Sequence, residues 1–107
     1  DTGEIIHQIR PKIYLADNSH TIGNRLIKDM SRCFCDIIAN HNNLSSEPQP
    51  NKRIKGKLYL QKDFNHKSCK KLYENINSDM IKKYLSNIKN YKSPKLVTNK
   101  GLIKKLK

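Results

Sequence analysis

The sequence has no Trp, few acidic residues and no long apolar run. Its 107 residues include nine Asp and Glu against 22 Lys and Arg, and the aromatic residues are five Tyr and two Phe. Because no run of about 18 apolar residues occurs, we expect no membrane span. The few, scattered acids do not suggest a carboxylate pair for acid–base catalysis, and the scarce aromatics do not suggest a stacking surface for single-stranded RNA.

Cysteine is also scarce, and its odd number argues against a closed disulfide framework. The three residues are Cys33, Cys35 and Cys69. One disulfide with one free thiol and three reduced thiols both stay open. Neither paired Cys ligands nor a Gly-rich phosphate loop occurs, and the histidines match no compact zinc motif. We therefore predict no metal, no cofactor and no catalytic centre. The histidines considered are His7, His20, His41 and His66.

Positive charge is what the sequence has in excess. The net charge is +13, with a pI near 9.8. Such a surplus attracts polyanions such as RNA, DNA, anionic lipids or acidic proteins. Lys greatly outnumbers Arg, however, and Asn and Ile are frequent, which is the bias that an AT-rich genome imposes. Selection for binding and coding bias are therefore two open explanations of the charge.

Residues 21–41 form the longest proline-free amphipathic stretch. Ile22, Leu26, Met30, Cys33 and Ile37 fall on one side of a helix at about 100° per residue, with further apolar residues on its flank. Charged residues occupy the opposite side. The pattern predicts a helix with a broad buried stripe, capped by Ser19 or Thr21. The flanking residues are Ile27, Phe34 and Ile38.

Other segments predict shorter elements. Residues 64–76, capped by Asp63, and 79–91 are amphipathic, and residues 1–10 fit a short helix that ends before Pro11. A last short turn is expected near 102–106. Residues 13–15 are interpreted as an extended connector that packs Tyr14 or Leu15 on the core. The Pro- and Ser-rich residues 44–56 predict an exposed loop.

The fold class predicted is all-α, a small antiparallel helical bundle in a single domain over 1–107, with a mobile loop near 42–56 and a basic tail over 95–107. If the helices over 21–41 and 64–76 pack together, Cys33 and Cys69 can meet as packed thiols or as a disulfide. The predicted core is Ile22, Leu26, Met30, Cys33, Ile37, Phe64, Leu72, Ile76, Ile81, Tyr84, Leu85 and Ile88.

Two binding functions are compatible with these features. The first is a non-enzymatic binding or scaffold domain that contacts a protein partner through the exposed loop and a helix face. The second is a nucleic-acid-binding subunit, for example of a ribonucleoprotein assembly, held by Lys–phosphate contacts. Backbone contact is favoured over base reading, because base reading relies on Arg. The candidate polyanion-binding residues are Lys52, Arg53, Lys55, Lys57, Lys67, Lys70, Lys71, Lys82 and Lys83.

Overall fold

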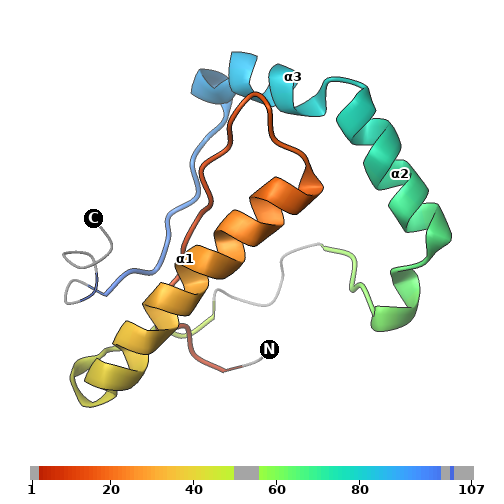
Figure 1. Cartoon of the computed structure of the whole chain (residues 1–107). Coiled ribbons are helices and arrows are strands. Elements are labelled where there is room, and N and C mark those ends of the chain that lie inside the picture. Colours follow the sequence, from red (N-terminus) through yellow and green to blue (C-terminus); the bar gives the residue numbers. More distant parts are fainter. Residues whose placement is uncertain (1–2, 50–55, 100–101, 103–107) are drawn as a thin grey trace.

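The structure, a computed structural model, describes residues 3–49, 56–99 and 102. These residues form three α-helices, and no strand occurs among them, so the predicted all-α class is confirmed (Figure 1). The α-helices are α1 (Ser19–Asn40), α2 (His66–Asn77) and α3 (Met80–Ser86). Single turns of 3₁₀ helix are η1 (His41–Asn43), η2 (Gln61–Asp63) and η3 (Ile88–Asn90).

A capping box starts α1, and its first residue is Asn18 instead of the predicted Ser19 or Thr21. The Asn18 side chain accepts hydrogen bonds from the backbone N–H groups of His20 and Thr21, at 2.9 and 3.0 Å. In return, the Thr21 hydroxyl accepts from the Asn18 N–H at 2.9 Å. These bonds satisfy N–H groups that have no partner inside the helix, and therefore place the start of α1 two residues before the predicted one.

The segment that leads into α1 is held against it by an ion pair. The guanidinium of Arg25 donates to both carboxylate oxygens of Asp17, at 2.9 and 2.7 Å, and lies over the Tyr14 ring at 4.6 Å. Tyr14 and Leu15 themselves are exposed, so the prediction that one of them packs on the core is wrong. The turn is anchored through charge and stacking, and Ile13 is a half-buried apolar residue of this segment.

The second and third helices begin later than predicted. Asn65 caps α2, accepting from the N–H groups of Lys67 and Ser68. Asp63, the predicted cap, lies in η2, where it accepts from the Leu60 N–H. Asp79 separates α2 from α3 with a left-handed backbone conformation (φ 60°). α3 ends at Ser86, and the rest of the predicted helix is the 3₁₀ turn η3.

The N-terminal segment is extended, so the helix predicted over residues 1–10 is wrong. Ile5 exchanges two backbone hydrogen bonds with Glu47, at 2.7 and 2.8 Å. Gln8 donates its N–H to the Val97 carbonyl at 2.8 Å and accepts from the Val97 N–H through its side chain at 2.9 Å. β-Branched Ile residues accept an extended conformation readily, and partners distant in sequence satisfy the backbone here.

Asn99 ties three extended segments together. Its side-chain amide donates to the carbonyls of Ile6 and Ser45, and its side-chain oxygen accepts from the Ser45 N–H and hydroxyl. Its own backbone N–H donates to Nδ1 of His7 at 3.1 Å. Burial lowers the pKa of His7, which favours the neutral ring that this acceptor role requires. Figure 1 shows the N-terminal and C-terminal segments side by side along α1.

The core is small. Among the described residues, Cys33 and Leu102 are fully buried and Ile81 is 8% exposed. Most of the predicted core is half-buried, and the prediction is wrong for Met30, Phe64 and Ile88, which are exposed. The buried Leu102 and Asn99 were not predicted.

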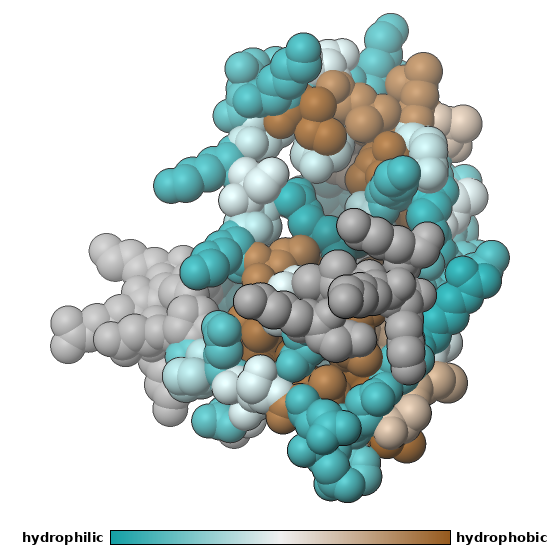
Figure 2. All heavy atoms as spheres, turned by 90° about the vertical axis from the view of Figure 1, so that its left-hand side faces the viewer, coloured by the Kyte–Doolittle hydropathy of each residue, from teal (hydrophilic) through white to brown (hydrophobic). Residues whose placement is uncertain are grey.

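The helices are openly arranged. The radius of gyration is 16.5 Å, whereas a compact domain of this size has about 13 Å. α2 packs against α3, while α1 and α2 lie apart in Figure 1. On the face drawn in Figure 2, hydrophobic side chains reach the surface at the height of α3 and again lower down.

Candidate functional site

One side of α1 presents exposed apolar side chains, here called the α1 outer face. It consists of Ile27, Met30, Phe34 and Ile38, which are 66, 39, 58 and 58% exposed. At about 100° per residue these four positions fall within an arc of about 80°. No charged residue of α1 falls in that arc. In a chain of which 29% is charged, an uncharged exposed helix face is a distinct feature.

A shallow apolar groove extends this face toward the N-terminal segment. It has a volume of about 410 Å³ and is lined by Ile9, Leu26, Ile27, Met30 and Ser31. Ile9 comes from the extended N-terminal segment, and the other four residues come from α1. The groove therefore exists because the N-terminal segment runs beside α1 instead of forming a helix.

The α1 outer face was not predicted as a site. Ile27, Phe34 and Ile38 were recognised as flanks of the buried stripe, and Met30 was assigned to the core. In the structure, burial centres on Cys33, and the flank on the Met30 side stays uncovered. The available signal was the width of the stripe, which exceeds what a single layer of neighbouring chain covers.

A second exposed apolar group lies in residues 58–64, which precede α2. Leu58, Tyr59, Leu60 and Phe64 are 79, 71, 50 and 74% exposed. Lys57, a predicted polyanion-binding residue, lies 5.1 Å from the centre of the Tyr59 ring. Its ammonium group is therefore engaged with an aromatic face while still exposed.

The predicted basic residues lie on the surface of α2 and α3. Lys67, Lys70 and Lys71 share one exposed side of α2, as their spacing of three and four residues requires. The neighbouring Glu74 carboxylate lies 4.0 Å from the Lys70 ammonium, and both side chains are exposed. On α3, Lys82 and Lys83 are exposed as well. The remaining predicted residues, Lys52, Arg53 and Lys55, lie outside the described residues.

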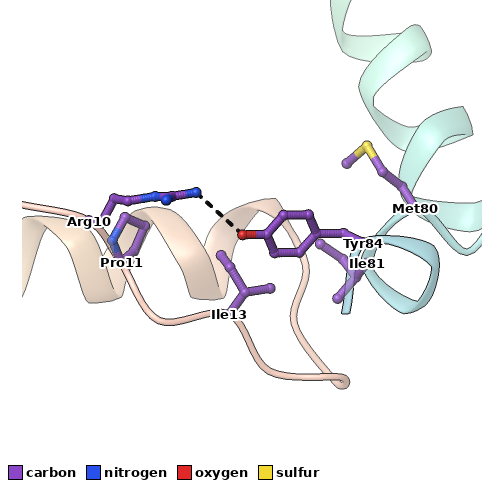
Figure 3. A pocket seen from close by; sticks show the side chains of 6 residues that line it. All are labelled: Arg10, Pro11, Ile13, Met80, Ile81 and Tyr84. Carbon is purple, nitrogen blue, oxygen red and sulfur yellow. Dashed lines mark hydrogen bonds between the residues drawn. The ribbon is translucent and has the colours of Figure 1, made fainter. Parts of the chain in front are cut away.

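A pocket of about 330 Å³ separates the N-terminal segment from α3 (Figure 3). The Arg10 guanidinium donates to the Tyr84 hydroxyl across it at 3.4 Å. The Tyr84 ring also stacks on Tyr91, with 5.4 Å between centroids. Its lining residues are Arg10, Pro11, Ile13, Met80, Ile81 and Tyr84.

All three cysteines are free thiols. A disulfide between Cys33 and Cys69 stays a prediction. Cys33 is buried and Cys35 is exposed. The helical periodicity predicts this difference, because at about 100° per residue Cys35 points away from the stripe that contains Cys33. Burial, with the nearby Asp36 carboxylate, raises the pKa of the Cys33 thiol. Within 3–49, 56–99 and 102, no three metal-ligating side chains come together.

None of the described helices is long and apolar enough to cross a membrane. Comparison with known proteins gives no further assignment: no family model, curated protein or solved structure matches this chain.

Proposed function

We propose that this chain is a non-enzymatic helical binding domain that docks the α1 outer face on a protein partner. The observation that carries the proposal is the exposure of Ile27, Phe34 and Ile38 on one uncharged side of α1. Contiguous exposed apolar patches are typical of protein interaction sites, since leaving them in water forgoes the free energy of burial.

The small core supports the same proposal. Few side chains of the described residues are fully buried, and the radius of gyration is that of an open molecule. Burial of further apolar surface against a partner would stabilise such a chain by about 25 cal/mol per Å². We propose the antiparallel bundle predicted from the sequence for the bound state, in which the partner supplies a helix on the α1 outer face.

The charge of the chain favours an acidic amphipathic helix as the partner. The net charge is +13, and the exposed Lys28 and Arg32 lie on α1 beyond one edge of the α1 outer face. A helix that places its apolar side on Phe34 and in the groove beside Ile9 would bring its polar side near these cations. Opposite charge at the rim of an interface accelerates association and selects the partner.

Two synthetic helical peptides test this proposal by fluorescence anisotropy. Both carry the same Leu stripe, and their polar sides are Glu-rich in one and Lys-rich in the other. We expect the Glu-rich peptide to bind and the double substitution Phe34→Ala with Ile38→Ala to weaken binding about tenfold or more, because central apolar contacts dominate such interfaces.

The control is Leu58→Ala, which removes an even more exposed apolar side chain outside α1. It is expected to leave binding unchanged. Equal weakening by the control, or equal binding of a Glu-rich peptide without the Leu stripe, would show that charge alone drives association and would contradict the proposal.

The alternative function is phosphate-backbone binding by the lysines. The exposed side shared by Lys67, Lys70 and Lys71 on α2 is the observation that favours it. An RNA duplex and a single strand of equal length are the probes. If this function holds, affinity falls steeply with salt, and Lys70→Gln with Lys71→Gln reduces the salt dependence. If affinity for both probes is unaffected by these substitutions, the alternative is excluded for α2.

A further inference from the structure

The pocket between the N-terminal segment and α3 combines an apolar wall with one cationic group. Pro11 and Ile13 approach from one side, and Met80 and Ile81 from the other (Figure 3). Its volume, about 330 Å³, lies at the lower end of the range for small-molecule sites, about 300–1,000 Å³. Met80 adds adaptability, because a thioether side chain fits differently shaped apolar groups.

The polar end of the pocket is Arg10 together with Tyr84. The bond between them is long, at 3.4 Å, and uses one nitrogen of a guanidinium that has five N–H donors. The ion pairs with carboxylates among the described residues are those of Arg25 and Lys70, and Arg10 takes part in neither. Arg10 therefore keeps donors in the fork geometry that matches a carboxylate, beside a hydroxyl that can also donate.

We propose that this pocket binds an apolar chain that ends in a carboxylate. The chain lies against Ile13, Met80 and Ile81. The carboxylate accepts two hydrogen bonds from the Arg10 guanidinium and one from the Tyr84 hydroxyl, and the 3.4 Å bond between those two groups is replaced. The site is separate from the α1 outer face, so the inference does not depend on the proposed function.

Nuclear magnetic resonance titrations with octanoate and octylammonium test the inference on the whole chain. These probes share their apolar chain and differ in charge. We expect octanoate to shift the methyl signals of Ile13, Met80 and Ile81, and octylammonium to bind at least tenfold more weakly. Arg10→Gln should reduce octanoate affinity at least tenfold, and Tyr84→Phe, which keeps the ring, a few-fold.

Lys12→Gln is the matched control, since it removes an exposed cation two residues away that does not line the pocket. It should leave octanoate affinity unchanged. A second arm uses a short peptide ending in Leu, with a free carboxylate or as the amide. Binding of the free form alone would indicate a peptide C-terminus as the natural ligand, and binding of octanoate alone a fatty acid.

Three results would overturn the inference. They are equal affinity for both octyl probes, unchanged affinity after Arg10→Gln, and methyl shifts confined to residues outside the pocket.

Discussion

At the residue scale, Asn99 is the buried polar side chain around which three extended segments meet. Its side chain holds backbone groups of Ile6 and Ser45 that are distant from it in the sequence. Asn99→Ala removes these hydrogen bonds, each of which contributes a net amount of about 0.5–1.5 kcal/mol, so the expected total is on the order of 1–3 kcal/mol. We expect a loss of this size in the free energy of unfolding, measured by urea denaturation.

Asn24→Ala provides the comparison, because Asn24 is exposed in α1. Its effect is expected to stay within about 0.5 kcal/mol. If both substitutions had equally small effects, Asn99 would not be holding the three segments together.

The Asp17–Arg25 ion pair predicts a pH dependence of stability. The Arg25 guanidinium and the Tyr14 N–H hold the pKa of Asp17 well below its usual value. Because the folded-state pKa is depressed, the stabilisation is complete above the unfolded pKa of about 3.9 and declines as pH falls toward the folded-state pKa. The stability deficit of Asp17→Asn should therefore be constant above about pH 5 and shrink below about pH 4.

Urea midpoints across this pH range measure the deficit. Glu74→Gln is the control, since its pair with Lys70 is exposed and long at 4.0 Å. Such surface pairs contribute little, so this variant should follow the unmodified chain at every pH. A deficit of Asp17→Asn that persists unchanged into strong acid would contradict the assignment.

The two cysteines of α1 should differ in reactivity. Cys35 is exposed, whereas Cys33 is fully buried and its thiol pKa is raised. Because the thiolate is the nucleophile, a maleimide should label Cys35 in the native state well before Cys33. Mass spectrometry of partly labelled protein locates the adduct. Faster labelling of Cys33 would mean that α1 is rotated or opened at this point.

At the scale of elements, α3 depends on one buried contact residue. Ile81 is 8% exposed, whereas Ile88, after the end of α3, is 47% exposed. We expect Ile81→Ala to destabilise the fold by about 2–4 kcal/mol and Ile88→Ala by under about 1 kcal/mol. Urea denaturation checks both. Equal losses would indicate that η3 packs as tightly as α3.

The elements that the sequence predicts well are those whose pattern is local. The stripe through Cys33 predicts α1 and the exposure of Cys35, because a helix side chain's direction follows from its position alone. The N-terminal segment was mispredicted because its backbone partners, Glu47 and Val97, are far away in the sequence. Asn99 carries no pattern at all, since one polar residue becomes structural only when three segments meet around it.

The candidate site shows the same limit. The spacing of Ile27, Phe34 and Ile38 predicts that they share a side of α1. Whether that side is covered depends on where the rest of the chain runs, which helical spacing does not encode. The lysines of α2 lie on its exposed side, and their residue type alone makes this expected, since Lys remains solvated in almost any packing.

For the whole molecule, the pairing of the first and last described segments has a consequence for how fast the chain folds. The bonds from Asn99 to His7 and Ile6 span 92 and 93 residues. Helices α1 to α3 form from local contacts within microseconds, but these bonds require the ends of a very long loop to meet. Folding rates fall as contacts become more distant in sequence. We therefore expect helical signal to return early in refolding and the burial of Leu102 to follow in a later, slower phase.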